Sequence, residues 1–247
     1  MTMINDNFQN RKRYNIPKAQ LVLTDIPYNI GINAYGSNPM WYKDGDNKNG
    51  ESKLAGKQFF DTDKNFNLNE FFHFCNKLVK PEPKKTGDAG CMIVFCAFEQ
   101  LHGLIEVAKK HNFKNYINLC FYKNYSPQVL KANMRIVGNT EYALLFYRDK
   151  LPKFNNNGRM IFNSMPMPRD TETPKVHPTQ KSVEVLKDLI RIFTDKGDVV
   201  IDPCAGSGST LLASEAIGRE SYGFEIKKEF VKDFNEKLAV KIPCNLF

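Results

Sequence analysis

Residues 199–210 read VVIDPCAGSGST, and this stretch decides the fold. Its first residues are apolar and β-branched, so they predict a buried strand that ends at Asp202. The chain then enters a turn in which Gly206 and Gly208 let the backbone approach a ligand, and a helix begins near Thr210. A strand, a glycine-rich loop and a helix in this order are typical of α/β proteins that hold a small molecule at the carboxyl end of a strand.

The rest of the chain continues this alternation of short apolar runs with amphipathic ones. Because strands separated by helices form βαβ units, the pattern predicts a mainly parallel sheet with helices on both faces. We expect a single domain over 1–247, with two long irregular segments at 29–67 and 151–176. The expected strands are 19–26, 90–98, 116–123, 141–148, 198–202 and 221–226, and the expected helices are 68–79, 100–112, 181–194, 210–218 and 227–239.

The composition argues against a membrane-spanning, secreted or zinc-binding protein. No apolar run approaches the ~20 residues that span a bilayer, and the first residues lack a signal sequence, so we expect a cytoplasmic protein without a membrane partner. The six cysteines form no C-x-x-C pair and there are only four histidines, so the spacings of a zinc site do not occur. We expect reduced core thiols and no metal.

The net charge of +8 is unevenly distributed. No acid lies between Glu106 and Glu141, whereas lysines, arginines, aromatic residues and amides are interleaved there, a mixture that nucleic-acid surfaces use for phosphates and base edges. A solvated basic face is an equally good interpretation of the charge alone. The candidate DNA contacts in this stretch are Lys123, Asn124, Lys131 and Arg135.

Two acids flank the glycine-rich loop in a pattern that suits a cationic nucleoside. Asp202 precedes the loop, where it would repel a pyrophosphate but attract a ligand amine. Glu225 ends the next strand, 225 − 202 = 23 residues on, where an acid can accept hydrogen bonds from both hydroxyls of a ribose. An adenosine with a positively charged tail is S-adenosylmethionine, which we therefore predict as the cofactor. The alternative is a structural turn followed by a surface charge.

Residues 177–226, together with TDIPYNIG at 24–31, resemble the amino-methylating DNA methyltransferases of the beta order, in which the catalytic tetrapeptide comes first and the cofactor motif last. The resemblance implies a Rossmann-like, circularly permuted seven-stranded methyltransferase sheet, S-adenosylmethionine as cofactor and double-stranded DNA as partner. It also implies that Thr179 and Lys181 of HPTQK help to hold the methionine carboxylate. The expected cofactor-binding residues are Asp202, Pro203, Ala205, Gly206, Gly208, Thr210, Glu225 and Ile226, with His177, Thr179 and Lys181.

The tetrapeptide Asp25-Ile26-Pro27-Tyr28 supplies the expected catalytic residues. An exocyclic base amine is a poor nucleophile because its lone pair is delocalised into the ring. Hydrogen bonds from the amine to the Asp25 carboxylate and the Ile26 carbonyl would draw the nitrogen towards tetrahedral geometry. Pro27 would fix the turn, and Tyr28 would offer a face on which the flipped base stacks.

The sequence departs from the family pattern at two positions. Ile26 stands where the family has proline, and it keeps the carbonyl and the extended bias of a residue before proline. Ser182 stands where proline is more frequent. Glu141 and Asn124 match weaker family positions at the border of the base pocket, and we interpret Cys204 as a small packing residue rather than a nucleophile.

Adenine N6 is the predicted target, because the cytosine-N4 enzymes of the family mostly begin the tetrapeptide with serine. Cytosine N4 and a binding protein that has lost catalysis are the alternatives; a nicotinamide-dependent oxidoreductase would not explain Asp202 or the tetrapeptide. The 29–67 segment is expected to contact DNA, and 151–176 resembles a short target-recognition segment. RNA as substrate, a homodimer, a partner restriction nuclease and the recognition sequence are left open by the sequence.

Overall fold

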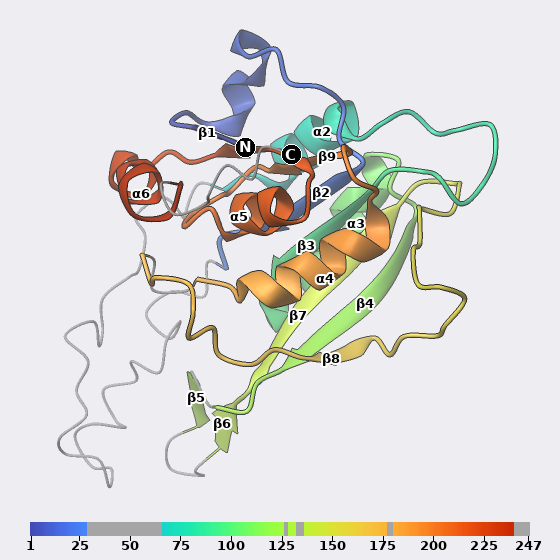
Figure 1. The fold of residues 1–247 in the computed structure, drawn as a ribbon. Coiled ribbons are helices and arrows are strands. Elements are labelled where there is room, and N and C mark those ends of the chain that lie inside the picture. Colours follow the sequence, from blue (N-terminus) through green and yellow to red (C-terminus); the bar gives the residue numbers. More distant parts are fainter. Residues whose placement is uncertain (29–65, 126–127, 132–135, 177–179, 240–247) are drawn as a thin grey trace, which may run out of the picture.

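A computed structural model describes residues 1–28, 66–125, 128–131, 136–176 and 180–239 (Figure 1). The elements in chain order are β1 (Thr2–Ile4), η1 (Phe8–Arg13), β2 (Leu21–Asp25), α2 (Leu68–Leu78), β3 (Cys91–Cys96), η4 (Phe98–Gln100), α3 (Leu101–Lys110), β4 (Asn115–Tyr122), β5 (Gln128–Lys131), β6 (Ile136–Gly138), β7 (Thr140–Tyr147), β8 (Ser164–Pro166), α4 (Val183–Phe193), β9 (Val199–Asp202), α5 (Ser209–Ala216), β10 (Glu220–Phe224), α6 (Lys228–Asp233) and η6 (Phe234–Leu238).

A single sheet in the order β1-β10-β9-β2-β3-β7-β4-β8 forms the centre of the molecule. The first five of these strands run parallel, so the predicted α/β fold with a mostly parallel sheet is confirmed. Its eight strands are one more than the seven expected; both edge strands, β1 beside β10 and β8 beside β4, lie outside the strands predicted from the sequence. The glycine-loop strand β9, late in the chain, lies beside the early strand β2, as a permuted chain requires.

Strand β7 runs antiparallel to both of its neighbours, β3 and β4. The alternating pattern of the sequence did not reveal this reversal, because a buried strand has the same composition in either direction. The reversal brings the start of β7 to the carboxyl ends of β3 and β4: Cys96 and Cys120 both pair with Tyr142.

Helices cover both faces of the sheet because its central strands are apolar on both sides. In β2, Val22 packs into a cluster with α2 and α3, whereas Leu21 and Leu23 pack into a second cluster with α4 and α5. Successive strand residues point to opposite faces, which explains this division. Both faces are therefore closed, and the open positions lie at the ends of the strands.

The carboxyl ends of the parallel strands carry the predicted site. Asp25 ends β2 and Asp202 ends β9, while Glu225 directly follows β10. Because these strands are parallel and β9 lies between the other two, the three acids share one edge of the sheet.

Of the two irregular segments predicted from the sequence, the structure describes all of 151–176 but little of 29–67. Most of 29–67 lies outside the described residues. The segment 151–176 includes β8, and Met167 within it is buried. Asp170 accepts a hydrogen bond from the N–H of Val183 and so caps α4, whose own N-cap residue Ser182 makes no such side-chain bond.

Strands β5 and β6 form a separate hairpin between β4 and β7, and Figure 1 shows it extending from the end of the sheet. Among the described residues, no helix has the length and apolar character needed to cross a membrane.

Candidate active site

The tetrapeptide at the end of β2 is held in place by its neighbours. The N–H of Ile26 donates to the carbonyl of Phe95 over 3.2 Å, which continues the pairing of β2 with β3. The Gln100 side chain donates to the carbonyl of Pro27 over 2.8 Å. The Ile26 side chain is buried, so this position packs into the core as well as shaping the turn.

The two oxygens of the Asp25 carboxyl group have different surroundings. Oδ2 lies 2.9 Å from Nζ of Lys181. Oδ1 is buried and has no hydrogen-bond partner within the part of the chain that the structure describes. Burial raises the pKa of Asp25, while the Lys181 ammonium opposes the rise. A buried acceptor without a partner is costly, so Oδ1 has the character of a binding group rather than a structural one.

Lys181 has its ammonium group among acids and aromatic residues. Besides Asp25, it contacts Oε2 of Glu141 at 2.5 Å and the hydroxyl of Tyr28 at 3.2 Å, and it lies 4.9 Å from the centre of the Phe95 ring. Sequence reasoning assigned Lys181 to the carboxylate of the cofactor and did not foresee these contacts. No sequence signal indicates them, since Asp25 and Lys181 are 181 − 25 = 156 residues apart.

The glycine-rich loop is attached to the end of β10. The N–H of Gly206 donates to Oε2 of Glu225 over 2.9 Å, and the N–H of Lys227 donates to Oε1 over 2.7 Å. Gly206 and Gly208 have positive φ values of 50° and 76°. These are backbone conformations that glycine adopts without strain, as the sequence pattern predicted.

Asp202 is buried at the start of this loop. Its Oδ1 accepts hydrogen bonds from the hydroxyl of Thr24 at 2.7 Å and from the N–H of Cys204 at 3.1 Å. Burial raises the pKa of Asp202 to about 6, although these bonds favour the charged form. Thr24 thus connects the end of β2 to the loop, a contact that the sequence analysis missed.

The remaining residues predicted to bind the cofactor differ in solvent exposure. Pro203, Ala205 and Thr210 are buried and support the loop from inside. Ile226 follows Glu225 and is exposed, so its surface is available to a ligand. His177 and Thr179 lie outside the described residues.

The residues predicted to contact DNA lie in different surroundings. The Lys123 side chain is only 9% exposed and is paired with Oε1 of Glu141, so its charge is already neutralised inside the protein. Asn124 follows it in a bend and is exposed. Lys131 ends β5 of the hairpin, and Arg135 lies outside the described residues.

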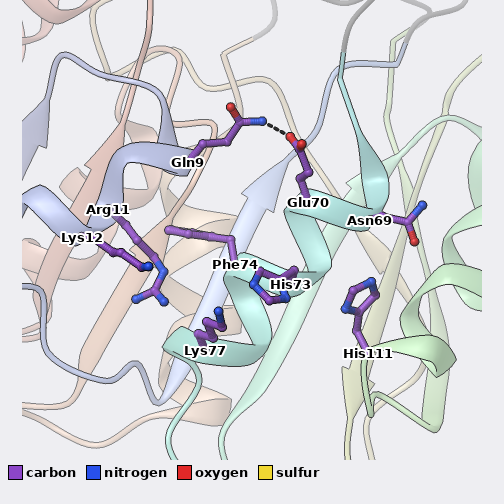
Figure 2. A pocket seen from close by; sticks show the side chains of 9 residues that line it. All are labelled: Gln9, Arg11, Lys12, Asn69, Glu70, His73, Phe74, Lys77 and His111. Carbon is purple, nitrogen blue, oxygen red and sulfur yellow. Dashed lines mark hydrogen bonds between the residues drawn. The ribbon is translucent and has the colours of Figure 1, made fainter.

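The pocket shown in Figure 2 is separate from this site. It is open, has a volume of about 500 Å³ and lies between η1, α2 and the end of α3. None of the acids at the carboxyl edge of the sheet contributes to it; its lining residues are Gln9, Arg11, Lys12, Asn69, Glu70, His73, Phe74, Lys77 and His111. The described residues contain no group of histidines, cysteines and acids able to hold a metal ion.

Comparison with protein families identifies the family of this chain. The family model described as DNA methylase, which covers the N6 and N4 amino-methylases, matches residues 19–236, most of the chain. The chain belongs to the N6/N4 DNA methylase family. The resemblance stated from the motifs is thereby confirmed, and with it the methyltransferase fold. This DNA methylase is an S-adenosylmethionine-dependent DNA methyltransferase.

The relatives of this DNA methylase include a DNA adenine methyltransferase and type II methyltransferases. It is 26% identical over 242 residues to the DNA adenine methyltransferase YhdJ of Escherichia coli, covering 90% of this chain and 76% of that protein. It is 21% identical to the type II methyltransferase M.HpaI of Haemophilus parainfluenzae, over 88% of this chain and 67% of that one.

Solved structures share the fold of this DNA methylase. The M1.HpyAVI complex with S-adenosylmethionine matches with a TM-score of 0.64 at 21% identity, covering 96% of this chain and 98% of the other. The cytosine-N4-specific PvuII DNA methyltransferase matches with a TM-score of 0.67 at 16% identity, over 99% of this chain and 87% of that one. Such distant likenesses show the fold and do not distinguish adenine from cytosine.

Proposed function

We propose that this protein methylates the exocyclic N6 of adenine in double-stranded DNA, with the base flipped into a site at the end of β2. The observation that carries the proposal is Oδ1 of Asp25, a buried acceptor without a partner among the described residues, located on the same sheet edge as the glycine-rich loop. A base amine donating to this oxygen would satisfy it.

The residues at the loop fit S-adenosylmethionine, which supplies an electrophilic methyl group when bound. The Glu225 carboxylate is half-buried and held by two backbone N–H groups, so its remaining lone pairs suit the ribose hydroxyls. The exposed side of Ile226 suits the flat face of the adenine ring. Asp202 suits the amine of the methionine part, and His177, Thr179 and Lys181 are proposed near its carboxylate only on the family resemblance.

The chemical task of the tetrapeptide is to make a delocalised amine nucleophilic. Oδ1 of Asp25 and the carbonyl of Ile26 accept the two amine hydrogens, which localises the lone pair on nitrogen. As the new N–C bond forms, positive charge grows on this nitrogen beside the Asp25 carboxylate, so the attraction is strongest in the transition state. The nitrogen then loses one proton, for which Oδ1 is the adjacent acceptor.

Tyr28 and Pro27 position the base for this step. The Tyr28 hydroxyl accepts a hydrogen bond from Lys181, which fixes the ring that the flipped base would stack upon. Gln100 holds the Pro27 carbonyl and thereby the turn that aims the Ile26 carbonyl. Both contacts are made before any base arrives, so little reorganisation is needed at the moment of reaction.

Adenine is favoured over cytosine by Asp25 itself and by a relative. The first residue of the tetrapeptide is an acid rather than the serine of most cytosine-N4 enzymes, and the relative YhdJ, which aligns over 90% of this chain, is a DNA adenine methyltransferase. We further propose that residues 29–67, the hairpin and 151–176 contact the DNA.

Analysis of the methylated nucleoside tests this proposal. The protein is incubated with methyl-labelled S-adenosylmethionine and mixed-sequence DNA, which is then hydrolysed for mass spectrometry. We expect label in N6-methyl-2′-deoxyadenosine. Label in N4-methyl-2′-deoxycytidine would replace the adenine assignment, and equal labelling of an RNA of the same sequence would contradict DNA as the preferred substrate.

A further inference from the structure

Four charged side chains from four parts of the chain converge beside the tetrapeptide. Asp25 ends β2 and Glu141 lies near the start of β7; Lys123 follows β4 and Lys181 precedes α4. They alternate in sign as Asp25, Lys181, Glu141 and Lys123, and each neighbour is in contact with the next. The cluster has no net charge, which reduces the cost of burying it.

Glu141 holds the centre of this cluster. Its Oε1 binds Lys123, and its Oε2 binds Lys181 at 2.5 Å. Burial acts to raise the pKa of Glu141, but the two ammonium groups outweigh it and lower the pKa to about 2. Glu141 therefore stays ionised at neutral pH, and it is unsuited to accept the proton that the base amine releases.

Lys181 connects Glu141 to Asp25. Its ammonium group is held between Oε2 of Glu141 and Oδ2 of Asp25, 2.5 Å and 2.9 Å away. A carboxylate that is fixed at one oxygen and at its Cβ has a defined direction for the other oxygen. That other oxygen is the unpartnered Oδ1, the acceptor of the proposed reaction.

We propose that Glu141 is a positioning residue for methyl transfer: it anchors Lys181, and Lys181 orients Asp25 so that Oδ1 faces the base amine. This inference rests on the proposed role of Asp25. Without the Glu141 carboxylate, the ammonium of Lys181 loses the nearer of its two carboxylate partners and is free to leave Oδ2 of Asp25. Both carboxylate oxygens of Glu141 bind lysines, so in this proposal Glu141 acts through Lys181 rather than on the base or the cofactor.

The charges around Asp25 give this role a measurable signature. Among the residues that the structure describes, the ionisable groups that face Asp25 are Lys181, Glu141, Tyr28, Cys96 and Asp202. The ammonium of Lys181 lowers the pKa of Asp25, whereas the carboxylate of Glu141 raises it. Removal of Lys181 should therefore move the acid limb of the methyl-transfer rate to higher pH. Loss of the Glu141 charge alone would move it to lower pH, but release of Lys181 from Oδ2 of Asp25 moves it to higher pH, so the positioning role predicts a shift to higher pH in Glu141→Gln as well.

The experiment measures single-turnover methyl transfer against pH for Glu141→Gln, Lys181→Met and Lys181→Arg, with Asp25→Ala alongside. Glu106→Gln, which breaks an exposed pair with Lys109, is the matched control. For Glu141→Gln we expect a rate lower by about tenfold or more at pH 7.5, the loss typical of a misplaced catalytic group, with cofactor and DNA affinities within about threefold of wild type. Glu106→Gln should match wild type, and Lys181→Arg should recover part of the rate that Lys181→Met loses.

The outcomes separate this inference from the proposed function. Shifts of the acid limb to higher pH in both Glu141→Gln and Lys181→Met support the positioning role, since loss of the Glu141 charge with Lys181 still in place would shift it to lower pH. A Glu141→Gln protein whose acid limb moves to lower pH, or whose rate and pH profile match wild type, overturns it. If Glu141→Gln does not fold, unshifted pH profiles in Lys181→Met overturn it instead. Full activity of Asp25→Ala would defeat the proposed function itself.

Discussion

The backbone N–H of Gly206 donates to Oε2 of Glu225 over 2.9 Å, so the glycine-rich loop is fastened to the end of the next strand. Glu225 thus has two tasks, to shape the loop and to offer acceptors for the ribose. Both tasks depend on its carboxylate, and both concern the cofactor.

Replacement of Glu225 by alanine should therefore weaken cofactor binding. Loss of a charged hydrogen-bond acceptor costs about 1.5–3 kcal/mol, which corresponds to a tenfold or larger rise in Kd for S-adenosylmethionine. Calorimetry on Glu225→Ala measures this, with Glu220→Ala at the exposed start of β10 as the control. Equal affinities of wild type and Glu225→Ala would remove Glu225 from the cofactor site.

The raised pKa of Asp202 predicts a pH dependence of cofactor binding. Because burial raises this pKa to about 6, the carboxyl group is mostly neutral at pH 5 and ionised at pH 7. An α-amino group, with an ordinary pKa of about 7.7–8.0, stays protonated across this window, so its attraction to Asp202 grows as the pH rises. We expect calorimetry to show tighter S-adenosylmethionine binding at pH 7 than at pH 5, and a flatter dependence for Asp202→Asn. The same slope in both proteins would show that another group is responsible.

Gly208 should be intolerant of any side chain. Its φ is 76°, and a Cβ there would lie 2.3 Å from the Phe234 ring. Backbone strain and overpacking together predict that Gly208→Ala lowers the free energy of unfolding by about 2–4 kcal/mol.

Gly103 is the matched control, because a side chain at this position should stabilise the protein. It lies within α3, and a Cβ there meets nothing within 4 Å. Urea denaturation should show Gly103→Ala to be more stable than wild type by about 0.5–1 kcal/mol, because alanine is the better helix former. An unaltered stability of Gly208→Ala would contradict the close packing of the loop on η6.

The two lysines predicted to contact DNA should behave differently. Lys123 is paired with Glu141 inside the protein, whereas Lys131 lies on the hairpin that extends from the carboxyl edge of the sheet. A lysine that binds a phosphate contributes about 0.9 to the slope of log K against log salt. We expect Lys131→Ala to flatten this slope and Lys123→Ala to leave it unchanged while slowing methyl transfer. A flattened slope in Lys123→Ala alone would reverse the assignment.

Local sequence patterns predicted most of the fold. The run from Leu21 and the run from Val199 are apolar at successive positions, and both form central strands buried on two faces. The predicted helix at 181–194 forms as α4, and its apolar side lies against the sheet. The direction of β7 and the strand at Thr2–Ile4 were not predicted, because strand direction leaves no local pattern and three residues are too few for a periodicity.

The sequence predicted where the candidate site residues lie in the fold, but not the contacts between them. Motif spacing located Asp25, the glycine-rich loop and Glu225, since each belongs to one strand end. The ion pair of Lys181 with Asp25 depends on where the start of α4 meets the end of β2, and this is a property of the folded sheet. For the same reason Lys123, expected at a DNA surface from its charge, is found paired with Glu141.

The central claim is that the Asp25 carboxylate makes the base amine nucleophilic, and single-turnover methyl transfer by Asp25→Ala tests it most directly. The interaction is strongest in the transition state, so the variant should lose methyl transfer by about a hundredfold or more while still binding S-adenosylmethionine and DNA. Asp25→Asn, which keeps the shape but not the charge, should also be severely impaired. Methyl transfer by Asp25→Ala at the wild-type rate, with the same methylated nucleoside as product, would contradict the account.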